Sequence, residues 1–260
     1  MIRTLAMIGF GEAGSTFASA MGCAGRAFDL KTDDPATREA MLETITKAGV
    51  EPCLSAADAL AGAQVVLSLV TASSALQAAT DDAPFIAPGA LWIDMNSVAP
   101  DTKRSAASVI EAAGGRYVDA AVMAPVQPAA LAVPLLLSGA HAAEAAQVLA
   151  QLGFSNIRLA GEDIGRASTI KMLRSVMVKG IEALTAEMVL AARRAGVADE
   201  VLGSLGEDWS QRAEYNLERM IRHGQRRADE MEEVAKTLET LGVEPLMTNG
   251  TITRQREMAQ

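Results

Sequence analysis

Lys171 poses the clearest chemical question in this chain. It lies in the stretch STIKMLRSVMVKG (168–180), within a segment whose apolar residues recur at helical spacing: Ile170, Leu173, Met177, Ile181, Leu184 and Met188. A helix that is apolar over so much of its circumference is expected to be largely buried. A buried lysine is costly unless another group pairs with it or uses it. Lys171 is therefore a candidate functional residue. The alternative is a lysine that extends its amine to solvent.

Two polar residues share this segment with Lys171. At about 100° per residue, Ser175 lies about 40° around the helix from Lys171 and one turn further along. A lysine and a hydroxyl so placed can hold the same substrate oxygen. Lys179 lies about 80° around and two turns further along, and it is expected to reach solvent.

The N-terminal stretch MIGFGEAG has the glycine spacing of a phosphate-binding loop, Gly-x-Gly-x-x-Gly, directly after an apolar run. The first glycine would turn the chain, the second would let the backbone approach a pyrophosphate, and the third would let a helix pack closely. The N-terminus of that helix would attract the anion. A glycine-rich turn of another α/β protein is the alternative. The predicted cofactor loop comprises Gly9, Phe10, Gly11, Glu12, Ala13 and Gly14.

Asp29 ends the second apolar run, AFDLK, 20 residues after Gly9 (29 − 9 = 20). An acid at this place would bond both hydroxyls of an adenosine ribose. The carboxylate favours NAD over NADP, because a 2′-phosphate would face it. Lys31 could still serve a phosphate, so the sequence predicts NAD(P) binding with a preference for NAD.

A second polar cluster lies in RHGQRRADEM (222–231). His223, Arg226, Arg227 and Glu230 fall three or four residues apart, so one helix face can carry all of them. Arginine suits bidentate recognition of a carboxylate or phosphate. A solvated helix face with internal ion pairs is the alternative.

The composition restricts the class of protein. The 260 residues are 50% hydrophobic and 21% charged, and the formal net charge is −9. Such an acidic balance argues against a nucleic-acid partner. No apolar run approaches the roughly 20 residues that span a bilayer. The N-terminus only faintly resembles a secretory signal, because Gly11 and Glu12 interrupt its apolar core. Cys23 and Cys53 show no metal or redox spacing, which predicts no metal site and a cytoplasmic protein.

Short apolar runs alternate with helix-like segments over the first two thirds of the chain. The predicted strands are 4–10, 27–31, 65–70, 91–96, 116–122, 134–139 and 156–160. This alternation predicts a mostly parallel sheet covered by helices on both faces. The fold class is therefore α/β, with a doubly wound, Rossmann-type NAD(P)-binding domain at 1–162.

From Asp163 onward the sequence has only helical patterns. They cover 164–195, 197–205, about 208–222, 225–241 and a short last segment. Residues 163–260 are therefore predicted to form an all-helical domain. Its apolar faces exceed what one neighbouring sheet could cover, which predicts a homodimer joined mainly through this domain.

Together these segments resemble the β-hydroxyacid dehydrogenase superfamily, which includes 3-hydroxyisobutyrate and 6-phosphogluconate dehydrogenases. LVTASSAL resembles the family's loop after the fourth strand, which implies that Val70 and Thr71 touch the nicotinamide side. DMNSVAP (94–100) is similar to its Asp-x-Ser-Thr-x-x-Pro loop, which implies that Asn96 and Ser97 lie near nicotinamide and substrate. GRASTIKMLRS resembles the segment with the catalytic lysine, so Lys171 would take or return the hydroxyl proton of the substrate.

Two departures from the family pattern concern the substrate. YVDAAVMAPV (117–126) corresponds to the family's substrate loop, but Met123 and Ala124 stand where the family has serine and glycine. Ser175 replaces the asparagine that usually follows the lysine by four residues. Both departures suggest the branch related to 6-phosphogluconate dehydrogenase through a short C-terminal region. Relatives place a C-terminal helix over the substrate mouth, which implies that His223 and Arg227 bind substrate.

The resemblance implies an NAD(P)-dependent oxidoreductase that transfers a hydride between the nicotinamide and a small polar alcohol, in the first place a hydroxy acid. One alternative is a non-catalytic dinucleotide sensor or partner-binding protein, which the altered substrate loop favours. The other is an imine reductase on the same architecture. Lys171 weighs against it, because those relatives usually lack the lysine.

Overall fold

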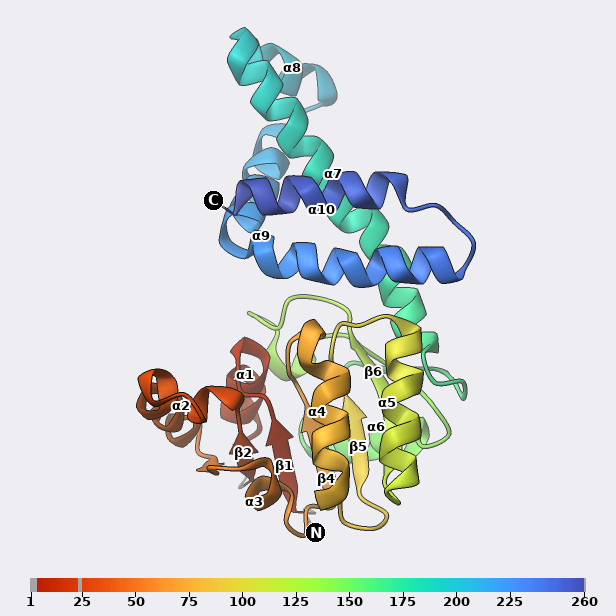
Figure 1. Ribbon diagram of the computed structural model, residues 1–260. Helices are drawn as coiled ribbons and strands as arrows, with labels where there is room; N and C mark the ends of the chain where they lie inside the picture. The colour runs from red at the N-terminus through yellow and green to blue at the C-terminus, as the bar shows by residue number, and fades with distance from the viewer. Residues whose placement is uncertain (1–3, 23–24, 260) are drawn as a thin grey trace. The chain divides into compact units, whose positions relative to one another are not determined.

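The structure is a computed structural model and describes residues 4–22 and 25–259. It forms two compact units, one up to Lys171 and one from Met172 onward, and each is described by itself (Figure 1). The two units divide within one long helix. The functional boundary predicted at 162/163 therefore stays a prediction.

The first unit is built on one eight-stranded sheet. Its strands are β1 (Leu5–Ile8), β2 (Arg26–Phe28), β3 (Glu51–Pro52), β4 (Val65–Ser68), β5 (Leu91–Asp94), β6 (Arg116–Val122), β7 (Leu135–Ser138) and β8 (Ile157–Gly161). The spatial order is β3-β2-β1-β4-β5-β6-β7-β8, and every neighbouring pair is parallel except β6 and β7. The winding direction reverses between β1 and β4. In sheets of this kind, ligands bind at the carboxyl ends of the strands near that reversal.

Helices cover both faces of this sheet, as predicted, and α4 and α5 are seen against one face in Figure 1. The helices are α1 (Glu12–Met21), α2 (Pro35–Lys47), α3 (Ala56–Leu60), α4 (Ala75–Asp82), α5 (Pro100–Ala112) and α6 (Ala142–Gln151). Successive side chains of β1 point alternately into two hydrophobic cores, one on each face of the sheet. Leu5 and Met7 pack with residues of α1, α2 and α6, whereas Ala6 and Ile8 pack with residues of α3, α4 and α5. This period of two is what strand geometry requires, and the predicted α/β fold class is confirmed.

Strand β3 and helix α3 were not predicted from the sequence. Strand β3 has two residues, Glu51 exposed and Pro52 half-buried, so no apolar run marks it. It exists because it pairs with β2 at the edge of the sheet. Cys53, directly after it, is a buried thiol without a disulfide. Cys23 lies outside the described residues.

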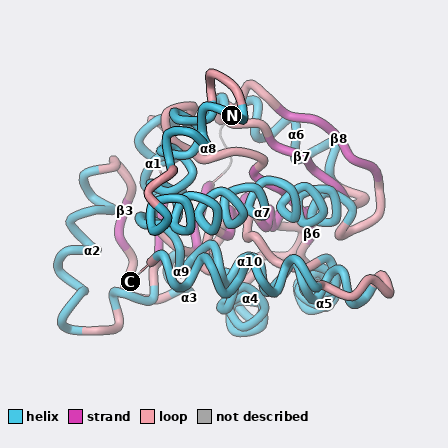
Figure 2. Tube along the Cα trace, turned by 90° about the horizontal axis from the view of Figure 1, so that it is seen from above, coloured by secondary structure: helices cyan, strands magenta, loops and turns pink. Residues whose placement is uncertain are grey.

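The second unit is helical, as predicted. Helix α7 (Arg166–Ala195) begins in the first unit, and α8 (Ala198–Leu205), α9 (Trp209–Thr240) and α10 (Leu246–Met258) follow. One of its cores joins Met172 of α7, Met231 of α9 and Ile252 of α10. Figures 1 and 2 show α9 and α10 running side by side.

The prediction of two helices at 208–222 and 225–241 is wrong, because α9 continues through Gly224. A Cβ at Gly224 would lie 2.3 Å from the backbone oxygen of Gln255 and 2.8 Å from Cβ of Ala259. Gly224 is therefore a position of close approach between α9 and α10, and not a helix break.

The prediction that the apolar stripe of α7 is buried is also wrong for the single chain. Met177 is 64% exposed and Leu184 is 56% exposed, and Ile170, Leu173 and Ile181 are exposed as well. Lys179, expected to reach solvent, is instead 5% exposed, and its Nζ donates to Oε2 of Glu230 at 2.6 Å. Helix α7 thus turns a charged residue inward and a stripe of large apolar residues outward.

Candidate active site

The glycine loop closes tightly on the end of β4. Gly9 has a φ of +89°, and a Cβ there would lie 2.6 Å from the backbone oxygen of Leu69. A Cβ at Gly14 would lie 2.9 Å from the backbone oxygen of Gly9. Larger side chains at these two positions would force the loop open, so both glycines have the mechanical roles predicted for them.

Gly11 differs, because a Cβ there would meet nothing within 4 Å. It is the N-cap of α1, and as a glycine it has no side chain that could cap that helix end. A helix N-terminus of this kind fits a pyrophosphate. Phe10 is 1% exposed and packs in the core, so only its backbone can serve a ligand. Glu12 is exposed and Ala13 is half-buried in the first turn of α1.

The Asp29 carboxylate is hydrogen-bonded to the backbone of the glycine loop. Its Oδ2 accepts the N–H of Phe10 at 2.7 Å, and its Oδ1 accepts the N–H of Lys31 at 2.9 Å. Each carboxylate oxygen has a second lone pair for a further donor. Asp29 can therefore also accept ribose hydroxyls. Lys31 is exposed in the short helical turn Leu30–Thr32 that follows.

The loops after β4 and β5 carry the next predicted residues. Val70 is half-buried, and Thr71 is exposed with its Oγ1 3.0 Å from Oγ of Ser74. Asn96 is 3% exposed, and its Nδ2 donates to Oγ of Ser68 at 2.9 Å. Oδ1 of Asn96 is buried without a hydrogen-bond partner. A buried acceptor of this kind fits a ligand that brings a donor.

The structure brings Lys171 and Ser97 together, although 74 residues separate them (171 − 97 = 74). Nζ of Lys171 donates to Oγ of Ser97, and both side chains are half-buried. The lysine comes from the start of α7, and the serine comes from the loop after β5. This contact joins the amine to the edge of the sheet at which the strands have their carboxyl ends.

The predicted substrate loop follows β6. Met123 and Ala124 are half-buried, and the N–H of Met123 donates to the backbone oxygen of Pro134 at 2.9 Å. Further along this loop, Nε2 of Gln127 donates to Oγ1 of Thr16 on α1 at 3.0 Å. The predicted substrate loop is thus hydrogen-bonded to α1, the helix that follows the glycine loop.

The remaining predicted residues belong to the second unit. Ser175 is buried on α7, one turn after Lys171, and His223 is half-buried on α9. Arg227 is 5% exposed and forms an ion pair with Glu182, whose Oε2 also accepts Nε2 of Gln255 at 3.1 Å. Arg227 is therefore buried and paired with a residue of α7, which differs from the solvated helix face with internal ion pairs that the sequence left open as an alternative.

Burial lowers the pKa of the Lys179 amine, which belongs to the same unit. The neighbouring Glu230 carboxylate opposes that shift.

Sequence reasoning missed a fully buried set of polar side chains in the first unit. Lys103 of α5 forms an ion pair with Asp94 at 2.8 Å and lies 3.5 Å from Asp119. The usable signal was the presence of Asp94 and Asp119 inside two otherwise apolar strand patterns, LWIDMN and RYVDAAV. An ionised group there requires a partner.

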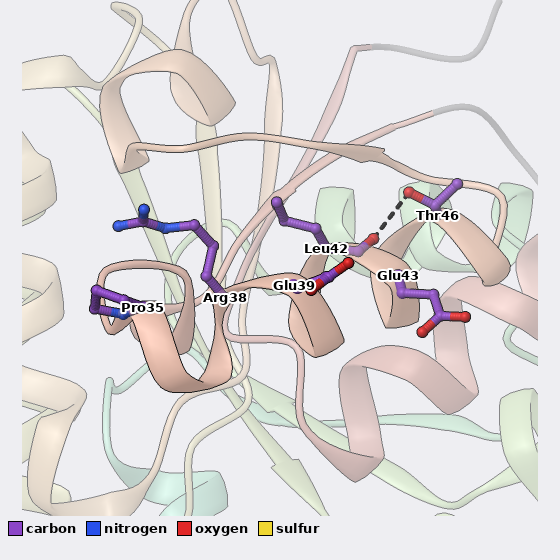
Figure 3. Close-up of a pocket in the computed structure, with 6 residues that line it drawn as sticks. All are labelled: Pro35, Arg38, Glu39, Leu42, Glu43 and Thr46. Carbon is purple, nitrogen blue, oxygen red and sulfur yellow. Dashed lines mark hydrogen bonds between the residues drawn. The ribbon is translucent and has the colours of Figure 1, made fainter.

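Other features of the described residues carry no comparable chemistry. A hollow of about 400 Å³ is lined by α2 alone, as Figure 3 shows, and it includes none of the predicted site residues. Within 4–22 and 25–259, no group of His, Cys, Asp and Glu side chains could hold a metal ion. Over the same residues, every helix is too short or too polar to cross a membrane.

Comparison with known proteins places these features in context. The family model for the NAD binding domain of 6-phosphogluconate dehydrogenase matches residues 4–159, and a domain of unknown function (DUF1932) matches residues 192–258. A conserved hypothetical protein from Sinorhizobium meliloti is 41% identical with a TM-score of 0.76, and the match covers 98% of this chain and 88% of that one.

Two further relatives connect the chain with named dehydrogenases. A conserved protein of unknown function, described as structurally similar to 3-hydroxyacid dehydrogenases, is 32% identical with a TM-score of 0.73 over 98% of this chain and 96% of that one. An NAD-dependent L-serine dehydrogenase from Pseudomonas aeruginosa is 27% identical over 222 residues, which cover 80% of this chain and 72% of that protein.

Proposed function

This chain belongs to the β-hydroxyacid dehydrogenase superfamily, and from this premise we propose that it is an NAD(P)-dependent oxidoreductase for a small hydroxy acid, with Lys171 as its general acid and base. The observation that carries the proposal is the hydrogen bond from Nζ of Lys171 to Oγ of Ser97. This bond holds the amine beside the loop after β5, in the unit that also contains the glycine loop.

Different residues of the first unit would bind the cofactor and transfer the proton. A bound nicotinamide cofactor supplies the acceptor for the hydride. The N-terminus of α1 at Gly11 would hold the pyrophosphate, and Asp29 would accept the ribose hydroxyls. The neutral amine of Lys171 would accept the hydroxyl proton of the substrate as the carbon loses its hydride. The substrate would become a carbonyl compound, its hydride would pass to that acceptor and the lysine would be protonated. The reverse reaction would return both the hydride and the proton.

We infer a preference for NAD from Asp29. Its carboxylate already accepts two backbone N–H groups, which fix it at the end of β2. A 2′-phosphate at this place would meet a fixed negative charge. The relative from Pseudomonas aeruginosa is named as NAD-dependent, which supports the same choice. Lys31 is the residue that would favour NADP.

The substrate proposed first is a β-hydroxy acid of about the size of L-serine, by analogy with that relative. Asn96, Ser97, Met123 and Ala124 would bind substrate in the first unit. Ser175 and His223 belong to the second unit, and their part in substrate binding stays a prediction from the sequence. Arg227 would bind a substrate carboxylate only by leaving its buried ion pair with Glu182.

We further propose a homodimer joined mainly through the helical domain, because α7 exposes a stripe of large apolar residues. A cytoplasmic setting is proposed as well, since Cys53 is a buried thiol without a disulfide.

The second candidate function is a dinucleotide sensor without turnover. Met123 and Ala124, which stand in place of the serine and glycine of the superfamily pattern, favour it. An imine reductase is the third candidate, and Lys171 weighs against it.

One experiment separates the three candidates. The protein is titrated with NAD(H) and NADP(H), and nicotinamide absorbance is then followed over a panel of hydroxy acids that includes L-serine. Oxidation of a hydroxy acid supports the dehydrogenase. Cofactor binding without any substrate-dependent change supports the sensor. Turnover only with a ketone and an amine together supports the imine reductase.

A further inference from the structure

A network of polar side chains lies fully buried in the first unit, and the proposed reaction uses none of its members. The network consists of Asp94, Lys103, Tyr117, Asp119, Ser138 and Ser168. Burying ionised groups costs free energy, and a well-packed apolar core of the same volume is often at least as stable. The network therefore calls for an explanation other than stability alone.

Lys103 is the centre of the network. Its Nζ donates to the backbone oxygen of Asp94 at 2.6 Å and to Oδ1 of Asp94 at 2.8 Å. The same Nζ lies 3.5 Å from Oδ1 of Asp119. The hydroxyl of Tyr117 donates to Oδ2 of Asp94 at 2.6 Å. One lysine of α5 thus joins the carboxyl end of β5 to a carboxylate within β6.

The first arm of the network leads to the loop after β5. Oδ1 of Asp94 accepts the backbone N–H of Asn96 at 2.9 Å. The next residue along this loop is Ser97, which accepts the hydrogen bond of Lys171. Asp94 therefore fixes the path of the chain immediately before the serine.

The second arm leads to the start of α7. Asp119 accepts the backbone N–H of Ser168 at 3.0 Å with Oδ2 and the hydroxyl of Ser168 at 2.6 Å with Oδ1. Ser138 donates to Oδ2 of Asp119 at 3.0 Å and accepts the N–H of Ala167 at 3.0 Å. A carboxylate at a helix N-terminus is favourable, because the helix dipole is positive there. Lys171 follows Ser168 by three residues on the same helix.

We propose that Lys103 is a positioning residue, which holds Asp94 and Asp119 at the spacing that brings Ser97 and Lys171 into contact. Both partners of that contact are thereby anchored to one buried ammonium group. The inference rests on the proposed function for its consequence in turnover. Its geometric part concerns only the placement of the Lys171 amine.

The test measures that placement without requiring turnover. Wild type, Ser168→Ala and Lys103→Met are treated with acetic anhydride, and acetylation is followed for each lysine by mass spectrometry. Ser168→Ala removes one hydroxyl and keeps the backbone cap, so it is the variant expected to fold. Loss of the Ser97 contact should raise the acetylation rate of Lys171 about threefold, the scale of one hydrogen bond. The rate of the exposed Lys47 should stay unchanged and serves as internal reference.

Ser108→Ala is the matched control, because the Ser108 hydroxyl of α5 donates to the backbone oxygen of Arg104 on its own helix. It should leave the Lys171 rate at the wild-type value. An unchanged Lys171 rate in folded Lys103→Met overturns the inference, and if that variant does not fold, an unchanged rate in folded Ser168→Ala overturns it.

A turnover readout accompanies the acetylation. In both network variants kcat should fall while the Kd for NADH stays near the wild-type value. If the wild type oxidises no hydroxy acid, the proposed function has failed, and the acetylation rates still decide the positioning role.

Discussion

At the scale of single residues, Lys171 is the side chain on which the proposed chemistry depends. Lys171→Met keeps the apolar stem and removes the amine. We expect kcat to fall more than about 100-fold, the scale of a positioned acid or base. The Kd for NADH should change little, because the amine serves the substrate oxygen.

Lys47→Met is the control for Lys171→Met. Lys47 is exposed and forms a helical ion pair with Glu43 on α2, so its loss should not affect kcat. Steady-state kinetics and a fluorescence titration measure both quantities. Retained turnover in Lys171→Met would show that the Lys171 amine is not the general acid and base.

Asp29 determines the expected cofactor preference. Asp29→Asn removes the charge and keeps one acceptor oxygen, which can serve one of the two backbone N–H groups that Asp29 accepts. The Kd for NAD should rise about tenfold, since a hydrogen bond to a charged acceptor contributes about that much. Discrimination against NADP should fall at the same time. Isothermal titration with both cofactors measures this. Tighter binding of NADP than of NAD by the wild type would show that Lys31 outweighs Asp29.

Asp82 should make stability depend on pH. Burial, with a smaller contribution from Asp81, raises the pKa of Asp82 from 3.8 to about 7, and its Oδ2 has no hydrogen-bond partner. Because the folded pKa lies above the unfolded one, the charged form destabilises the fold. Stability should therefore fall as the pH rises from about 4 to about 7.

Asp82→Asn removes this buried charge. It should stabilise the protein at pH 8 by on the order of 2 kcal/mol and have little effect near pH 4. Thermal unfolding at the two pH values measures the difference. Asp81→Asn, at an exposed neighbour, is the control and should have a smaller effect. Equal stabilisation by Asp82→Asn at both pH values would contradict the assignment.

At the scale of helices, the close approach of α9 and α10 depends on Gly224. Gly224→Ala would place a Cβ 2.3 Å from a backbone oxygen of α10, and neither backbone can move cheaply. We expect a loss of about 1–3 kcal/mol in the free energy of unfolding, the usual cost of overpacking. Gly250→Ala, in α10, meets nothing within 4 Å. It should instead stabilise by about 0.5–1 kcal/mol, because alanine favours the helix. Similar Tm values for the two variants would contradict this account.

The comparison of α9 with β1 shows which elements a sequence can predict. Strand β1 was predictable, because its period of two follows from two cores on opposite faces of the sheet. The continuity of α9 through Gly224 was not, because it depends on a neighbouring helix that local sequence does not describe. The orientation of α7 also depends on tertiary partners. Glu230 draws Lys179 inward, so the apolar stripe of α7 faces outward.

The residues of the candidate site also differ in whether the local sequence could predict them. The glycine loop and Asp29 are near each other in sequence and could be located from spacing alone. The contact of Lys171 with Ser97 joins distant segments, and only the resemblance to a family pointed to both residues. Lys103 was missed, because its sequence context on α5 is that of an ordinary surface lysine. Its burial follows from Asp94 and Asp119 on the strands that α5 covers.

At the scale of the whole molecule, the exposed stripe of α7 indicates a partner. From Ile170 to Leu184 the stripe extends about 21 Å at 1.5 Å per residue. Its residues are large and at least 41% exposed in the single chain. A contiguous apolar surface of this kind is typical of an interface, and a two-fold dimer is the commonest way to cover it.

The variants that test this dimer change only exposed residues. Met177→Glu and Leu184→Glu place charges on the stripe without disturbing the buried side of α7, so each chain should still fold. Wild type should sediment as a dimer at micromolar concentration, and the double variant should sediment as a monomer. Leu54→Glu is the control, because Leu54 is 63% exposed in the first unit while Met177 is 64% exposed, and it should leave the dimer intact. A monomeric wild type would disprove the dimer. A dimer that Leu54→Glu alone disrupts would place the interface in the dinucleotide-binding unit instead.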